Sequence, residues 1–289
     1  MASMPVDARQ SPGDRSAAPP SLAAIHVYPV KSARGIELTA AEVGPTGFRH
    51  DRQWMVVDGD GNFITQRSDP RMCFMHTAID GESLTLRVAG LEDVRVPLVP
   101  GAGEVREVTV WNDRVRGLIA GAEVSAWLAE FLGAPHHLAF IAEPEVRQVD
   151  LSYGRPGDRV GFADGYPFLL ISEASLEELN RRLASRGQEP LPMNRFRPNL
   201  VVRDTLPFEE DDWADIGICD VSFRVAKPCA RCVVTTTNQE TGQVGKEPLK
   251  TLATFRRVNG KVMFGQNLIH DGRGRLQVGA GVTVKRRRA

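Results

Sequence analysis

Short segments in which apolar and polar residues alternate make up most of the chain between Leu22 and Gly117. Alternation with a period of two is typical of β-strands that bury one face. Gly, Asp and Asn, which favour turns, separate these segments. The predicted strand regions are IHVYPVKS, GIELTAAEVG, RQWMVVDGDGNFITQ, SLTLRVAG and VREVTVWNDRVRG. Within the third region, Asp58-Gly59 and Asp60-Gly61 predict a hairpin turn between MVV and FIT.

Two later segments repeat apolar residues with a helical period. The first is VSAWLAEFLG, whose buried face would consist of Val124, Trp127, Leu128, Phe131 and Leu132. Gly133 is placed to end this helix. The second is LISEASLEELNRRLAS, whose buried stripe would consist of Leu176, Leu179 and Leu183. Either Ser172 or Ser175 can cap its N-terminus.

The rest of the chain returns to β structure. Strands are predicted in FRPNLVV, DVSFRVAK and CVVTTT, a short helix in EPLKTLATFRR, and β structure in FGQNLIHDGRGRLQVGAGVTVK. PHHLAFIAEPEVRQVDLSYGRPGD has few regular signals, so we expect a boundary or long connection there, with His136 and His137 as loop residues. Because strands dominate and helices are few, we predict an α+β fold that is mostly β, with barrel-like sheets.

Composition narrows the class of protein. The 289 residues are 42% hydrophobic and 25% charged, which is typical of a globular chain with a real core. Lys plus Arg, 36, equals Asp plus Glu, 36, which disfavours nucleic-acid and membrane binding. We expect residues 1–21 to form a disordered leader and the terminal KRRR a solvated basic tail. Four cysteines are too few for a secreted disulfide framework, so we expect a cytoplasmic protein.

The motif KPCARC leaves several kinds of chemistry open. A structural zinc site needs four ligands, and Cys229 and Cys232 supply two. Cys219 and His270 stand apart, without the matching spacing. A thioredoxin-type pair needs a helix after its first cysteine, but VVTTT favours a strand. Both cysteines could also be small buried hydrophobes.

The surroundings of the pair favour a fourth interpretation, in which one thiolate binds a heavier metal. Lys227 and Arg231 place positive charge beside the thiols, which favours the thiolate form. Pro228 restricts the approach of the chain, and a strand after Cys232 would hold that residue rigidly. A soft thiolate beside cations suits a metal that is mostly ligated by another molecule. One cysteine would then bind the metal, and the other would support it.

Several motifs, in order along the chain, resemble the MOSC family of molybdenum-cofactor sulfurase C-terminal domains. KPCARCVVTT, GKEPLKTLATFRR and FGQNLI resemble its C-terminal signature. YPVKSARGIEL, DRQWMVVD and FITQR resemble the N-terminal β-barrel domain that accompanies it. Two further segments, FADGYPFLLISEASLEELN and NRFRPNLVV, lie between these regions and match the same family pattern. The resemblance runs from Leu22 to Val284. Within the family, the chain is similar to bacterial YcbX proteins and mitochondrial amidoxime-reducing components.

The resemblance implies an N-terminal β-barrel-like domain packed on a MOSC β-barrel domain. The expected organisation is a leader at 1–21, the MOSC N-terminal β-barrel domain at 22–140, the MOSC molybdenum-cofactor-binding domain at 141–285 and a basic tail at 286–289. A substrate cleft is expected at the domain junction.

The resemblance also implies a molybdenum cofactor, Mo-molybdopterin, whose metal takes a sulfur from one cysteine. The matching position is Cys232, which would be both metal ligand and catalytic residue, whereas Cys229 matches a position without a ligand role. The positions that match cofactor-binding residues are Lys31, Ser32, Arg52, Asp164, Arg197, Asn199 and Arg231. Cationic and hydroxyl donors of this kind suit a phosphate group.

The function that the resemblance implies is molybdenum-dependent reduction of N-hydroxylated compounds such as hydroxylamines, amidoximes or N-hydroxylated bases. YcbX proteins carry a ferredoxin-like module with clustered cysteines, which this chain lacks. We therefore expect no iron–sulfur cluster in this chain, and a separate electron-donor protein of ferredoxin or flavoprotein type. The alternative is a molybdenum-cofactor or sulfur carrier that uses a reactive cysteine. Pyridoxal phosphate, used by relatives with a sulfurase domain, is disfavoured because the chain is too short for that domain.

Overall fold

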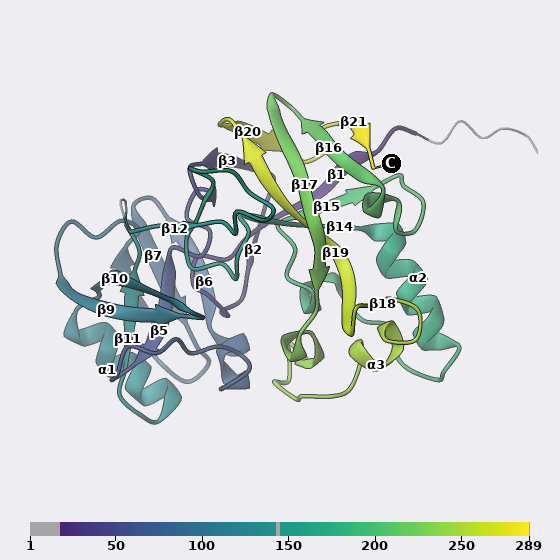
Figure 1. Cartoon of the computed structure of the whole chain (residues 1–289). Helices are drawn as coiled ribbons and strands as arrows, with labels where there is room; N and C mark the ends of the chain where they lie inside the picture. The colour runs from purple at the N-terminus through teal and green to yellow at the C-terminus, as the bar shows by residue number, and fades with distance from the viewer. Residues whose placement is uncertain (1–17, 143–144, 289) are drawn as a thin grey trace, which may run out of the picture.

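The computed structural model describes residues 18–142 and 145–288, which form two parts that lie side by side (Figure 1). One part is drawn mainly in blue and teal, and the other mainly in green and yellow. Most of the predicted leader at 1–21 lies outside the described residues. None of the helices in the described ranges is long and apolar enough to cross a membrane.

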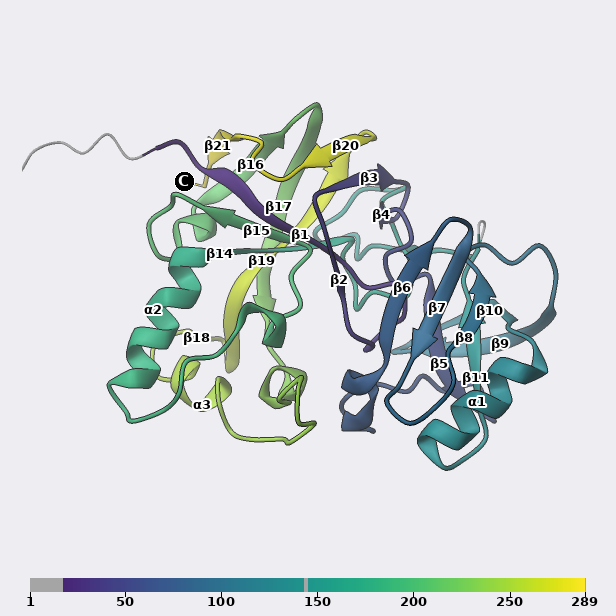
Figure 2. The same ribbon diagram turned by 180° about the vertical axis from the view of Figure 1, so that it is seen from behind.

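A nine-stranded sheet forms the green and yellow part. Its strands follow the order β2-β1-β15-β14-β19-β17-β16-β21, with β18 beside β19. Only the β14–β15 pair is parallel among these described strands. The strands are β1 (Ser21–Val27), β2 (Ile36–Leu38), β14 (Phe168–Ser172), β15 (Leu200–Arg203), β16 (Trp213–Ile218), β17 (Val221–Ala230), β18 (Arg257–Val258), β19 (Lys261–Asp271) and β21 (Val282–Arg287). β1, from the start of the chain, thus lies beside a strand from its second half (Figure 2).

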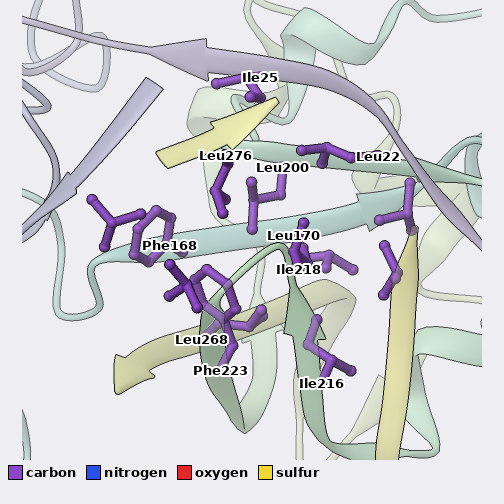
Figure 3. Packing of buried hydrophobic residues seen from close by; sticks show 14 of the residues in the cluster. Leu22, Ile25, Phe168, Leu170, Leu200, Ile216, Ile218, Phe223, Leu268 and Leu276 are labelled. Carbon is purple, nitrogen blue, oxygen red and sulfur yellow. The ribbon is translucent and has the colours of Figure 1, made fainter. Parts of the chain in front are cut away.

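Apolar side chains from both ends of the chain fill the core of this part (Figure 3). The labelled members are Leu22, Ile25, Phe168, Leu170, Leu200, Ile216, Ile218, Phe223, Leu268 and Leu276. Phe168 also meets Phe48 edge-on, with 4.8 Å between the ring centroids. A small sheet of β20 (Gly274–Gln277), β3 (Ala40–Gly44) and β4 (Gly47–Phe48) adds to this core. Since each buried Leu or Phe contributes about 1.5–3 kcal/mol, shared burial explains why the first strands dock here.

Among the described residues, the blue and teal part contains two smaller sheets and one α-helix. One sheet has the order β5-β11-β10-β9, and the other the order β6-β7-β8. The elements are β5 (Trp54–Asp58), β6 (His76–Asp80), β7 (Ser83–Arg87), β8 (Val94–Pro97), β9 (Glu104–Val110), β10 (Asp113–Ile119), α1 (Ala122–Leu132) and β11 (His136–Phe140). A two-stranded pair, β12 (Arg147–Gln148) and β13 (Arg159–Val160), follows in the chain. This part has its own apolar clusters, separate from the core under the large sheet.

Both predicted helices are confirmed. In α1, Phe131 is half-buried and the rest of the predicted face is buried, and Gly133 ends the helix with φ 74°. α2 spans Glu173–Ala184, and Ser172 rather than Ser175 is its N-cap. Leu179 and Leu183 are buried in it, and Leu176 is partly buried. The short helices are α3 (Leu249–Leu252), η1 (Pro70–Phe74), η2 (Met193–Arg195), η3 (Glu209–Asp211) and η4 (Val233–Thr236).

The mostly-β architecture with few helices is confirmed. The predicted hairpin is present as well, because Val57 and Phe63 form an antiparallel bridge across Asp58-Gly59-Asp60-Gly61. The barrel-like description holds only loosely, since no sheet of the described residues closes on itself. The predicted tail at 286–289 begins inside β21, where Arg286 pairs with Asp215.

Two local predictions were wrong. His136 and His137 are not loop residues but begin β11, which pairs with β5 on one side and β10 on the other. Partner strands on both sides stabilise this strand, so it needs little local signal. VVTTT is not a strand but contains η4. The hydroxyls of Thr235 and Thr236 donate to the carbonyls of Cys232 and Val233, and such local bonds stabilise a tight turn over a strand.

Candidate functional site

A pocket of about 140 Å3 draws its lining from both halves of the chain. All of the predicted site residues line it, namely Lys31, Ser32, Arg52, Asp164, Arg197, Asn199, Arg231 and Cys232. Cys229 lines it as well. Two segments of the N-terminal half are joined here by backbone bonds, from Lys31 N to Trp54 O (2.8 Å) and from Arg52 N to Tyr28 O (2.7 Å). The arrangement brings the residues together, while their individual roles stay predictions.

The backbone at three of these residues is left-handed. Ser32, Arg52 and Arg197 have φ of 67°, 47° and 56°. For a residue with a side chain this conformation costs about 1 kcal/mol or more. Such residues persist only where the surrounding structure holds them, and they gather at functional sites. The backbone therefore supports a functional role for this pocket, on grounds separate from residue type.

Lys31 and Asp164 form the tightest ion pair in the pocket. Lys31 Nζ lies 2.5 Å from Asp164 Oδ1 and donates to the Phe162 carbonyl at 2.8 Å. Burial lowers the pKa of Lys31, and the Asp164 carboxylate opposes that shift. Desolvation would raise the pKa of Asp164, but Lys31 and the nearby arginines outweigh it, so this pKa is lowered. The short contact and the opposing effects of burial and of the partner's charge couple these two groups closely.

Arg67, which sequence reasoning missed, is the cation in contact with Cys232. Arg67 Nη2 lies 3.0 Å from Cys232 Sγ and 3.7 Å from Asp164 Oδ2. Its guanidinium stacks on the Trp111 ring at 4.5 Å, and Trp111 Nε1 donates to Asp164 Oδ1. A signal was available, because Arg67 is the last residue of the FITQR motif.

Tyr28 organises two of the predicted cations. The guanidiniums of Arg52 and Arg197 stack on its ring at 4.2 and 4.3 Å, and its hydroxyl donates to the Pro198 carbonyl. Burial raises the pKa of Tyr28 to about 12, so the phenol stays neutral. At Gly35 a Cβ would come within 2.4 Å of this ring, which explains the glycine.

Asn199 acts on the pocket through Arg52. Its Oδ1 accepts from Arg52 Nη1 at 2.8 Å and from Leu169 N at 3.3 Å, and its Nδ2 donates to the His26 carbonyl. These bonds engage both ends of the buried amide. The geometry therefore makes Asn199 a positioning residue for Arg52.

Arg197 and Arg231 have no ion pair within the described ranges. Arg197 Nη1 donates to the Ala33 carbonyl, and burial lowers the pKa of Arg197 to about 10, so it remains charged at neutral pH. Arg231 donates to the Phe196 carbonyl and to Cys229 Sγ. Its Nε is buried without a partner among the described residues. These two charges are therefore available to an anionic ligand.

The local structure around the two cysteines differs from the expected one. β17 ends at Ala230 and Cys232 caps η4, so Cys232 lies at a turn and not before a strand. Two bonds from Thr235 to its carbonyl hold it there. Lys227 Nζ lies over the rings of Tyr153 and Tyr166, at 4.4 and 5.1 Å. Within the described ranges, 18–142 and 145–288, no group of three or more His, Cys, Asp or Glu side chains could hold a metal ion by itself.

Residues 20–135 match the MOSC N-terminal beta barrel domain, and residues 157–283 match the MOSC domain. Human mitochondrial amidoxime-reducing component 1 is 33% identical over 279 residues, which cover 90% of this chain and 81% of that protein. The chain belongs to the MOSC family. Each residue of the predicted site lies inside one of the two matched ranges.

Other proteins similar to this MOSC chain differ in their length and in their sequence identity to it. Molybdenum cofactor sulfurase of Danio rerio is 34% identical over 271 residues, 87% of this chain but 32% of that protein. The crystal structure of the YUAD protein from Bacillus subtilis covers 91% of this chain and 93% of its own, at 12% identity and a TM-score of 0.40. That likeness is too weak to carry an argument.

Proposed function

We propose that this protein is a molybdenum-cofactor-dependent reductase of N-hydroxylated compounds that receives electrons from a separate donor protein. The observation that carries the proposal is the thiol of Cys232, held by Arg67, in a pocket with two arginines that lack acidic partners in the described chain. The similarity to a protein named amidoxime-reducing component supports the substrate class. A cytoplasmic location and pyridoxal phosphate binding find no support in the relatives, and neither is proposed.

The residues present fit a molybdenum–pterin cofactor. Arg197 and Arg231 would hold its phosphate, since their charges are uncompensated and Arg231 Nε has no partner among the described residues. Lys31 and Ser32 would add donors from the other side, and Cys232 would supply the sulfur ligand. When bound, the cofactor supplies the two-electron redox chemistry that cleavage of an N–O bond requires.

The chain's own residues orient the site and set its charge. Arg67 holds Cys232 Sγ by a hydrogen bond, and Trp111 fixes Arg67 by stacking on it. Asn199 and Tyr28 hold the guanidinium of Arg52, by a hydrogen bond and by stacking. Reduction of an N-hydroxyl group to the amine consumes two electrons and two protons and releases water. Lys31 Nζ donates to Asp164 Oδ1 at the pocket wall, and the carboxylate opposes the lowering of the Lys31 pKa by burial.

Metal analysis tests the ligand assignment. The protein is expressed with the cofactor pathway present, and bound molybdenum per chain is measured for the wild type, Cys232→Ser and Cys229→Ser. We expect Cys232→Ser to lose most of the metal and Cys229→Ser to keep most of it, because Cys229 matches a family position without a ligand role. Full metal content in Cys232→Ser would overturn the assignment. Reduction of an amidoxime by the loaded wild type, with a chemical reductant, tests the activity itself.

A second function is a molybdenum-cofactor or sulfur carrier. The similarity to molybdenum cofactor sulfurases and the half-buried thiol of Cys232 beside Arg67 favour it. A carrier would hold a persulfide on Cys232, formed when its thiolate takes the terminal sulfur of a persulfide on a donor protein and the donor's cysteine leaves as a thiol. Persulfide on Cys232 in protein that contains no molybdenum would favour the carrier, whereas molybdenum without persulfide favours the reductase.

A further inference from the structure

A second cavity, of about 360 Å3, borders η4, as the first pocket does. The two linings share no residue, but neighbouring residues of η4 separate them, with Thr235 in the first pocket and Thr236 in the second. The side chains that decide the chemistry of the second cavity are Arg195, Gln243, Lys246, Glu247 and Lys250. The proposed function uses none of these residues.

Arg195 is a buried charge that has no counter-ion among the described residues. Only 6% of the residue is exposed. Its Nε donates to the Thr235 carbonyl at 2.9 Å and its Nη2 to the Glu247 carbonyl at 3.2 Å. Both acceptors are neutral, and no carboxylate of the described chain forms an ion pair with Arg195. Buried charges in proteins are normally paired, so an anion bound beside this guanidinium would stabilise it.

Two lysines add to this charge at the rim. Lys250 N donates to the Lys246 carbonyl at 3.0 Å, which places the two residues one helical turn apart on the same side. Both side chains are exposed, and neither has an ion pair in the part of the chain that the structure describes. The acidic lining residue, Glu247, is engaged elsewhere, because its Oε2 accepts from Thr251 N at 2.9 Å. Three cations thus face one carboxylate.

We propose that the second cavity binds a small oxyanion of the phosphate class, either free phosphate or a phosphate monoester. Arg195 would bind it at the floor and Lys246 and Lys250 at the rim. A guanidinium fork suits two oxygens of a tetrahedral oxyanion, and ammonium groups add point charges that need no fixed direction. The inference is independent of the proposed reductase function.

Calorimetric titration of the full chain with inorganic phosphate, in a low-salt buffer without phosphate, tests the proposal. The first pocket is also cationic, so the protein is loaded with its cofactor, and Arg231→Gln is titrated in parallel. The second cavity is changed by the double substitution Lys246→Ala and Lys250→Ala, which alters only exposed side chains and so leaves the fold intact. Lys261→Ala, an exposed lysine outside both linings, is the matched control.

We expect one saturable site whose affinity falls about tenfold or more in the double lysine variant, because two charged donors are lost. Lys261→Ala should stay within about twofold of the wild type. Arg231→Gln, which we expect to lose the cofactor, should still bind phosphate in the second cavity. The proposal is overturned if phosphate does not saturate the protein, or if Arg231→Gln abolishes binding and the double lysine variant binds like the wild type. A parallel titration with adenosine monophosphate separates the two sources, since the tighter ligand identifies which form the cavity takes.

Discussion

The cations of the first pocket fall into two groups with different electrostatic surroundings. Lys31, Arg52 and Arg67, from the N-terminal half, form the N-terminal wall, and each has a carboxylate partner within 4.0 Å. Arg197 and Arg231, from the C-terminal half, form the C-terminal wall, and in the described chain they bond to carbonyls and a thiol instead. A ligand anion that approaches the N-terminal wall competes with carboxylates already in place, whereas the C-terminal wall offers charge without competition.

This difference assigns the two walls different roles, which could not be distinguished from the residue types alone. The paired N-terminal wall is a preorganised scaffold that holds Cys232 through Arg67. The unpaired C-terminal wall is the better candidate for the phosphate of a cofactor. Substitutions on the two walls should therefore affect different measurements.

The largest effect should follow from a change in the C-terminal wall. Arg197→Gln and Arg231→Gln each remove a charged donor, so we expect affinity for the cofactor to fall by about tenfold to a hundredfold. Molybdenum retained after extensive dialysis measures this loss. Lys31→Gln is the comparison, and it should lose less because Asp164 already neutralises Lys31. A greater loss in Lys31→Gln would reverse the assignment of the two walls.

The next largest effect should be on stability, through the N-terminal wall. Asp164→Asn leaves the buried Lys31 without a charged partner, and we expect the free energy of unfolding to fall by about 1–2 kcal/mol. The figure is below that for a fully buried pair because 63% of the Asp164 side chain is exposed. Urea unfolding at neutral pH measures it. Asp93→Asn breaks an exposed pair with Arg87 and should change stability by about 0.5 kcal/mol or less. Equal losses in the two variants would refute a special role for the Lys31 pair.

Acid should remove part of the same stabilisation. The pKa of Asp164 is lowered in the folded protein from an ordinary value of 3.8, so its contribution is present above that pH and is lost as the pH falls below it. The difference in unfolding free energy between the wild type and Asp164→Asn should therefore shrink as the pH falls below 3.8. Denaturant unfolding of both proteins over this range measures it. A difference that grows in acid would show that the carboxyl is not paired.

The smallest effect should come from the aromatic support of the N-terminal wall. Trp111→Ala removes the stacking on Arg67 and should cost about 0.5–1 kcal/mol of stability. Trp111→Phe keeps a ring under Arg67 and should cost less, although it loses the bond from Nε1 to Asp164. Both variants keep a side chain at the left-handed position, so backbone strain is the same in each. Losses of the same size would show that the hydrogen bond, and not the stacking, is what matters.

Elements with a strong local signal could be predicted from the sequence. The helical stripe around Trp127 with Gly133 after it, and the turn at Asp58 to Gly61, are each encoded by residues close together in the sequence, so a local pattern reveals them. β11 and η4 were missed because partner strands stabilise the first and hydroxyl bonds the second. Arg67 was missed for a similar reason, since its role depends on Cys232 and Trp111, which lie far from it in the sequence.

By itself, the sequence determined the residue types at the candidate site, the mostly-β architecture and the resemblance to the MOSC family, because these depend on side-chain chemistry, periodicity and ordered motifs. Tertiary structure alone decided which of the cations are neutralised and which are free. Electrostatic pairing depends on distances of a few ångströms between residues far apart in the chain, such as Lys31 and Asp164. No local pattern encodes those distances, so the division between the two walls and the uncompensated Arg195 emerge only from the folded chain.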